Sequence, residues 1–187
     1  TTDASGNVYV TGLFGSKSII FGTDTLTKAS IYSDVFLAKY DASGNVLWVK
    51  SAGGSNRDWG NSVSADASGN IYVTGYFSSD SIIFGTDTLT NAGTGNIFLA
   101  KYDSSGKVLW AHGAGGTADD VGNSVSTDAS GNVYITGSFY SASITFGTTT
   151  LTNSSKSSDI FLTKYDAAGK VLWAKRAGGT GYETGNS

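Results

Sequence analysis

The ten residues DASGNVYVTG at positions 3–12 occur three times in this chain of 187 residues. They return as DASGNIYVTG at 66–75 and as DASGNVYITG at 128–137. Two further motifs keep the same spacing: FGT-D/T-TLT from Phe21, Phe84 and Phe146, and V/I-FL-A/T-KYD from Val35, Ile97 and Ile160. The chain is therefore three copies of one unit of about 62 residues, a period typical of repeat architectures.

The copies follow one another without a linker, so we predict a single repeat domain over residues 1–187. Its units cover approximately 1–59, 60–121 and 122–184, and residues 185–187 begin the next strand. The chain has no Met, at position 1 or elsewhere. We therefore expect a processed product or a piece of a longer protein.

Each unit contains four strand signals, clearest in the middle copy. The strands are expected at Asn61–Asp66, Asn70–Phe77, Asn96–Asp103 and Lys107–Gly115. Short S-G turns join the first to the second strand and the third to the fourth, with Gly supplying the positive φ of a tight hairpin loop. Between the second and third strands, SIIFG and TLT predict a small hairpin or a long loop. The unit is thus a four-stranded antiparallel meander with one excursion.

The third strand of the middle copy is apolar on both faces, with Ile97 and Leu99 on one side and Phe98 and Ala100 on the other. A sheet of this kind must be covered on both sides, and a small sheet between copies of itself is a propeller blade. The predicted fold class is all-β, with β-propeller blades. The alternative is a threefold β-trefoil-like barrel, which closes with three units alone.

The motifs GN-x-YVTG, FLAKYD-x-SG and GNS together resemble the SBBP family of bacterial β-propeller repeats, over all three units. The resemblance implies a propeller-type fold in a secreted, multi-repeat bacterial protein, and it brings no catalytic site. Propellers usually have 4 to 8 blades, so three blades need partners. These would be further propeller repeats, from a homo-oligomer such as a dimer with six blades or from a longer parent chain.

Composition argues against several functions. Charged residues are 14% of the chain and the net charge is −3, which disfavours nucleic acid, and no apolar run is long enough for membrane insertion. The chain has no Cys, and its one His, His112, stands where the other copies have Lys50 and Lys175. We therefore expect no catalytic residues, no transition-metal site and no cofactor.

The Asp residues that open the turns raise the question of calcium. Each DASGN motif offers one carboxylate, whereas Ca²⁺ takes six or more oxygens, usually with several carboxylates converging. The favoured interpretation is that each Asp accepts hydrogen bonds from amides of its own turn. The Lys and Trp positions that recur in every copy are interpreted as structural: Lys39, Lys101 and Lys164; Trp48, Trp110 and Trp173.

Five residues are candidates for ligand binding. Asp58, Asp120 and Glu183 precede the GNS motifs, in loops expected to lead from one blade to the next and to form a ring of carboxylates near the axis. Trp59 is the one Trp outside the repeat pattern, and Tyr182 lies near the matching position of the third copy. An exposed aromatic ring stacks on a sugar or a protein partner.

The predicted function is that of a non-catalytic structural or adhesive module, not an enzyme. It would belong to a secreted or cell-surface bacterial protein and present propeller loops for interaction. The alternative is a carbohydrate-binding, lectin-like propeller that uses Trp59, Tyr182 and the loop acids to bind glycans.

Overall fold

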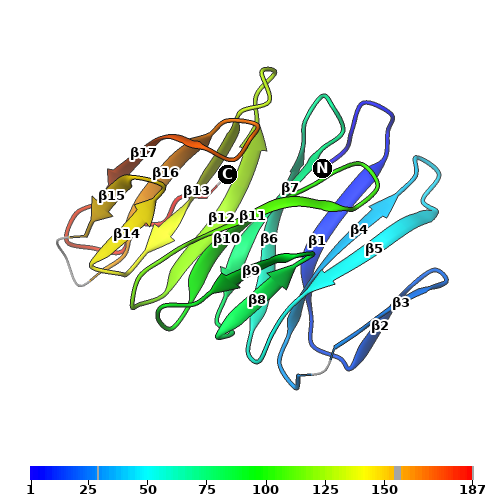
Figure 1. Cartoon of the computed structure of the whole chain (residues 1–187), viewed down its shortest axis with the longest axis horizontal. Helices are drawn as coiled ribbons and strands as arrows, with labels where there is room; N and C mark the ends of the chain where they lie inside the picture. Colours follow the sequence, from blue (N-terminus) through cyan, green and yellow to red (C-terminus); the bar gives the residue numbers. More distant parts are fainter. Residues whose placement is uncertain (29, 154–156, 187) are drawn as a thin grey trace.

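The computed structural model describes residues 1–28, 30–153 and 157–186. These residues form 17 β-strands and no helix, and accordingly no segment among them is a helix that could cross a membrane. The strands build three larger sheets and three two-stranded hairpins. Figure 1 shows the sheets in a row along the long axis, with the first copy at one end and the third at the other.

Each larger sheet is one blade. The first blade contains β1 (Val8–Phe14), β4 (Asp34–Tyr40) and β5 (Val46–Ala52). The second contains, from inside to outside, β6 (Asp58–Ala65), β7 (Ile71–Phe77), β10 (Asn96–Tyr102) and β11 (Val108–Ala114). The third contains β12 (Asp120–Thr127), β13 (Val133–Phe139), β16 (Asp159–Tyr165) and β17 (Val171–Ala177). All pairings within the blades are antiparallel, as the sequence predicts.

The excursion is a hairpin in every copy. The hairpins are β2 (Ser18–Phe21) with β3 (Asp24–Thr27), β8 (Ser81–Phe84) with β9 (Asp87–Thr90), and β14 (Ser143–Phe146) with β15 (Thr149–Thr152). In the second copy the ring of Phe84 lies 5.0 Å from that of Phe98, centroid to centroid, so the hairpin is held by aromatic packing on β10. Gly85, with φ of 59°, makes the turn.

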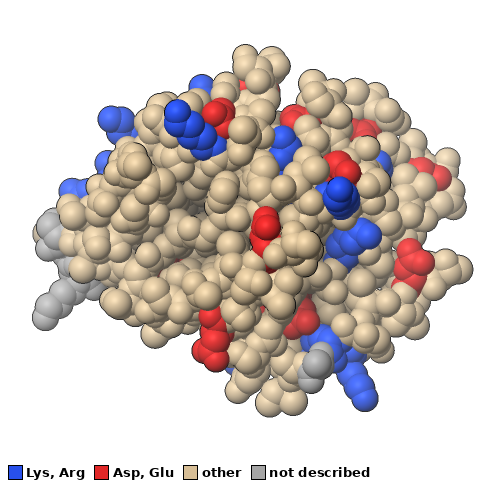
Figure 2. Space-filling model, viewed as in Figure 1, with Lys and Arg blue, Asp and Glu red and all other residues tan. Residues whose placement is uncertain are grey.

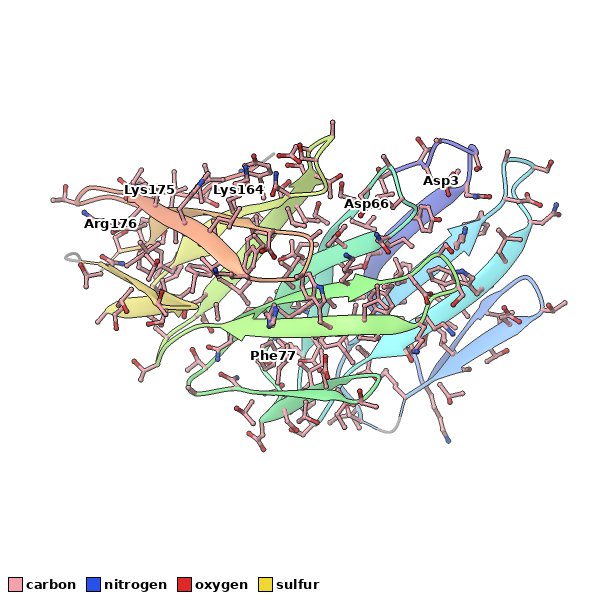
Figure 3. All side chains as sticks on the ribbon, turned by 45° about the horizontal axis from the view of Figure 1, so that its top comes forward. Asp3, Asp66, Phe77, Lys164, Lys175 and Arg176 are labelled. Atoms are coloured by element: carbon pink, nitrogen blue, oxygen red, sulfur yellow. The ribbon has the colours of Figure 1, made fainter. Side chains whose placement is uncertain are left out.

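The two cores lie between neighbouring blades. Tyr9, Leu37, Ile71 and Val73 belong to one buried cluster between the first and second blades, and a second cluster joins the second and third blades. In β10 all seven residues are buried. Phe77, labelled in Figure 3, has no exposed surface. The second blade is thus covered on both faces. The three larger sheets are separate and stacked, so the described residues do not form the single barrel of the trefoil alternative.

Loops lie at both ends of the strands of each blade, and the two ends differ. One end, which we call the turn edge, carries tight D-x-x-G turns, whose sequences are nearly the same in all copies. The opposite edge carries loops that differ between copies, and we call it the variable edge; it comprises the described residues of 28–33, 53–57, 91–95, 115–119, 153–158 and 178–183. Figure 2 shows charged side chains scattered over a mostly uncharged surface.

Candidate functional site

The carboxylates of the tight turns are occupied by their own turns. Asp66 accepts hydrogen bonds from the backbone N–H groups of Ser68 and Asn70, both at 2.9 Å. It also accepts from the Asn70 side-chain amide at 2.8 Å and from the Tyr72 hydroxyl at 3.0 Å. Asp3 has the matching four contacts in the first copy. The favoured interpretation of these acids as acceptors for turn amides is confirmed.

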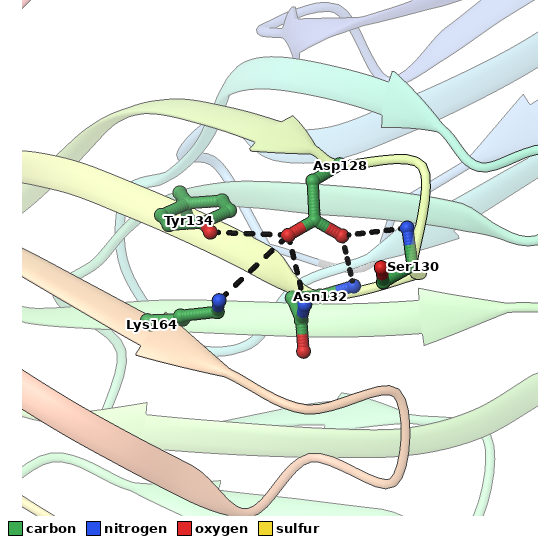
Figure 4. Close-up of polar contacts among 5 residues, drawn as sticks. All are labelled: Asp128, Ser130, Asn132, Tyr134 and Lys164. Carbon is green, nitrogen blue, oxygen red and sulfur yellow. Dashed lines mark hydrogen bonds and ion pairs between the residues drawn. The ribbon is translucent and has the colours of Figure 1, made fainter.

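Asp128 is the third member of this set, and Figure 4 shows its contacts with Ser130, Asn132 and Tyr134. These hydrogen bonds, above all that from the Asn132 side chain, lower the pKa of the Asp128 carboxyl to about 2. Among the residues that the structure describes, this is the one turn acid that also pairs with the repeated Lys, with Lys164 Nζ 3.7 Å from the carboxylate.

At the two junctions between blades, the repeated Lys residues contact the neighbouring blade and not the turn acid of their own blade. Lys39 donates to the backbone carbonyl of Ser104 at 3.2 Å, and Lys101 donates to that of Ala167 at 2.8 Å. Each bond crosses to a tight turn of the following blade. Each Lys also lies over the ring of the repeated Tyr of its own blade, as at Tyr72, 5.2 Å from the ring centre. These contacts explain the structural role interpreted for Lys39 and Lys101: each holds its blade against the next one, and we call this contact the Lys clamp.

A second set of contacts joins the inner strands. The Asn61 side chain donates to the carbonyl of Gly122 at 3.0 Å, and Asn123 donates to that of Gly185 at 2.9 Å. Thr127 donates to the carbonyl of Ala65 at 3.1 Å. The GNS motif is therefore used to link one blade to the next.

The predicted placement of the acids before GNS in open loops is wrong for Asp58 and Asp120. Both lie on strands and are fully buried. Asp58 accepts from Gly54 N–H and from the Ser79 hydroxyl and N–H, while its own N–H donates to the Ser33 carbonyl of the first blade. Burial raises the pKa of Asp58 to about 6 and also raises that of Asp120.

Neither carboxylate is open to a ligand, so the ring of carboxylates is not formed by this pair. The physical reason is that each acid satisfies backbone donors where the chain crosses between blades. Glu183 is half-buried and in part repeats this role, since its carboxylate accepts from Gly179 N–H at 3.3 Å and its N–H donates to the Ser158 carbonyl.

Of the two aromatic candidates, Tyr182 lies on the variable edge, and Trp59 lies at the start of β6, directly after the 53–57 loop of that edge. Trp59 is half-buried, donates its indole N–H to the Ser33 hydroxyl at 3.0 Å, and packs against Tyr76 with the ring centres 5.2 Å apart. Tyr182 is 81% exposed and lies 6.2 Å from the ring of Tyr140, which is 41% exposed. The structure thus gives each candidate a neighbouring Tyr. Their binding role remains a prediction.

Sequence reasoning missed several aromatic and apolar side chains at this edge and at the strand ends beside it. Tyr76 and Tyr140 are not at repeated aromatic positions, and Ile31 and Tyr32 are 86% and 40% exposed. The available signal was their difference from the matching positions of the other copies. For example, Leu13 and Ser138 replace Tyr76.

His112 lies between the second and third blades, away from the variable aromatic residues. Its ring stacks on Trp110 at 4.8 Å and lies 6.3 Å from that of Tyr165. A cavity of about 270 Å³ beside it is lined mainly by Gly, Val, Phe and Thr. Among the described residues, no three His, Cys, Asp or Glu side chains are placed to hold a metal ion.

Comparison with known proteins supports the repeat interpretation. Over 97% of its length the chain is 27% identical to an uncharacterized WD repeat-containing protein, L264, of Acanthamoeba polyphaga mimivirus. Over 46% of its length it is 36% identical to the regulatory protein FlaEY of Caulobacter vibrioides. These alignments span 15% and 9% of the two relatives. The family model SBBP, described as a beta-propeller repeat, matches residues 47–81, which run from β5 across the blade junction to β8. Residues 47–81 of this chain are therefore similar to the SBBP beta-propeller repeat.

Proposed function

We propose that this chain is a non-catalytic interaction module of a secreted or cell-surface bacterial protein, which binds partner proteins through its variable edge. The observation that carries the proposal is that the side chains at one edge make internal contacts, whereas those at the other edge are exposed and differ between copies. At the turn edge, Asp3, Asp66 and Asp128 accept the same hydrogen bonds, from the Ser, Asn and Tyr of their own copies. At the variable edge the copies differ, and exposed apolar and aromatic side chains gather there.

The composition of this edge suits adhesion. Tyr and Trp provide large contact areas with few rotatable bonds, and they are enriched where protein interfaces bind most strongly. Tyr140 and Tyr182 are exposed side by side on the third blade, and Ile31 and Tyr32 are exposed on the first. We treat the acids Asp58 and Asp120 as parts of the scaffold.

Binding to bacterial surfaces tests the proposal. Fluorescently labelled protein is titrated onto intact bacterial cells, with Tyr140→Ala/Tyr182→Ala as the test variant. The matched control is Leu109→Ala/Leu172→Ala, because these Leu side chains are each 47% exposed on the outer strands, away from the variable edge. Saturable binding that is lost in the test variant and kept in the control supports the proposal; equal binding by both variants contradicts it.

The lectin-like alternative rests on the ring pairs Trp59–Tyr76 and Tyr140–Tyr182. A glycan array distinguishes it from protein binding. Saturable sugar binding that disappears in Trp59→Ala or Tyr182→Ala favours the lectin, whereas protease-sensitive binding to cells with an empty array favours the protein partner.

A further inference from the structure

The cavity beside His112 lies at the junction between the second and third blades and has a volume of about 270 Å³. The second blade contributes His112 and Gly113 of β11 to its lining. The third blade contributes the end of β14 with the turn that follows it, and the tight turn from β16 to β17. Both walls come from copies that are adjacent in the chain. The volume is close to the lower end of the range for small-molecule pockets, about 300 Å³.

The floor of this cavity is aromatic and its rim is polar. Phe146 and Tyr165 are 1% and 4% exposed, so their rings form the buried floor. His112, Thr148 and Lys170 are exposed, so they form the rim. The ring planes of His112 and Tyr165 are nearly parallel, at 7°, with their centres 6.3 Å apart. These flat ring surfaces suit a flat, apolar ligand body.

Two polar groups of the cavity are free to donate. Among the residues that the structure describes, the Tyr165 hydroxyl has no hydrogen-bond partner, and burial raises the pKa of this phenol, so it keeps its proton. In the same described ranges the Lys170 ammonium forms no ion pair. A nearly buried hydroxyl without an acceptor is unfavourable, so a ligand that brings an acceptor into the cavity is stabilised there.

No described acid competes for these donors from the lining of the cavity. Two acids of the surrounding structure are used by backbone groups. The Asp166 carboxylate accepts from the N–H groups of Ala168 and Lys170, and the Asp87 carboxylate accepts from that of Ala111. The cavity therefore offers donors and a positive charge, which favour an anion.

The junction between the first and second blades has the same floor but a different rim. The residues that match Phe146, Tyr165 and Lys170 are Phe84, Tyr102 and Lys107. In place of the His112 ring this junction has Lys50, whose Cε lies 2.7 Å from the position that a Cβ on Gly106 would take. A flexible, charged chain thus replaces the flat imidazole, so His112 makes the cavity at the second junction distinct.

We propose that this cavity binds a small aromatic carboxylate, with its ring against Phe146, Tyr165 and His112 and its carboxylate on the Lys170 ammonium. The flat walls favour an aromatic ring, and the donors favour an anion. A neutral sugar fits less well, because its hydroxyl groups also need acceptors, and the lining has no carboxylate or amide side chain among the described residues. None of the lining residues belongs to the variable edge, so this proposal and the proposed function can fail independently.

Titration with trans-cinnamate, a planar aromatic carboxylate, tests the proposal. His112 is the one His of the chain, so its imidazole C–H signals in the NMR spectrum report on this cavity alone. The expected result is a saturable shift of these signals, with one cinnamate bound per chain by calorimetry. Cinnamamide, which has the same ring without the charge, should bind at least tenfold more weakly. Absence of saturation up to about 10 mM cinnamate, or equal binding of cinnamamide, overturns the proposal.

Two pairs of variants test the location. Lys170→Gln should weaken cinnamate binding at least tenfold and leave cinnamamide binding unchanged, whereas the matched control Lys107→Gln should change neither. His112→Ala should weaken the binding of both compounds, and its matched control Lys50→Ala should not. Lys170 and His112 are exposed, so both variants should unfold in urea at the wild-type midpoint. Equal losses in Lys170→Gln and Lys107→Gln, or unchanged binding in His112→Ala, overturn the assignment of the site.

Discussion

Replacing Asp66 should cost far more stability than replacing Asp103, although both open a D-x-S-G turn of the same blade. Asp66 is 9% exposed and holds the hydroxyl of Tyr72, a residue with no exposed surface. The Asp103 carboxylate accepts from Ser105 and from the N–H of Lys107, and both of these residues are exposed. Water can replace the lost acceptor at Asp103 but not at the Tyr72 hydroxyl.

The magnitudes follow from these partners. Losing a turn acceptor that water can replace costs about 1 kcal/mol, whereas a buried donor left without a partner costs about 1–3 kcal/mol more. We therefore expect Asp66→Ala to lower the free energy of unfolding by about 3 kcal/mol and Asp103→Ala by about 1 kcal/mol. In the Tyr72→Phe background the cost of Asp66→Ala should fall by about 1.5 kcal/mol, the coupling energy of the pair.

Urea unfolding followed by Trp fluorescence measures all four proteins under one condition. The comparison is internal, because the two turns share their sequence pattern and their blade. Equal costs for Asp66→Ala and Asp103→Ala, or additive effects of Asp66→Ala and Tyr72→Phe, would refute the assignment of the Tyr72 hydroxyl as the decisive partner.

Three further predictions concern the blade junctions. Lys101→Met should cost about 2 kcal/mol, because it removes a charge-assisted bond to the Ala167 carbonyl. Lys164→Met should cost clearly less, because its ion pair with Asp128 is open to solvent; equal losses in urea unfolding would argue against the clamp. The Asp58 pKa is raised from 3.8 to about 6 in the folded state, so between these pH values the folded protein binds more protons than the unfolded protein. The contribution of this group to the free energy of unfolding should therefore fall by at most about 3 kcal/mol as the pH rises from about 4 to about 6. Asp58→Asn should flatten that part of the curve of urea midpoint against pH, and an unchanged curve would assign the dependence elsewhere. Gly75→Ala should cost about 3 kcal/mol or more, because a Cβ there meets the Trp59 carbonyl, whereas Gly113→Ala, with 3.7 Å to its nearest neighbour, should change the melting temperature little.

Much of the fold could be predicted from the sequence because its causes are local. The strands β7, β10 and β11 lie within one residue of the ranges predicted from apolar runs bounded by turn Gly residues. The turn role of Asp66 followed from its place before S-G, since an Asx carboxylate reaches amides only two and four residues away. The need for neighbouring blades followed from apolar residues on both faces of one strand.

The tertiary structure alone decided which residues meet across the blades. Nothing in the local pattern distinguishes Val10 from Val73 or Lys164 from Lys101, yet one of each pair lies inside a junction and the other does not. Asp58 resembles a loop acid in sequence and is buried because the chain crosses between blades at that point. The repeat sequence thus determined each blade and its turns, because these depend on short-range sterics and hydrogen bonding. The burial of a side chain and its access to a ligand depended on which sheet lies opposite, and therefore on the position of its blade in the row.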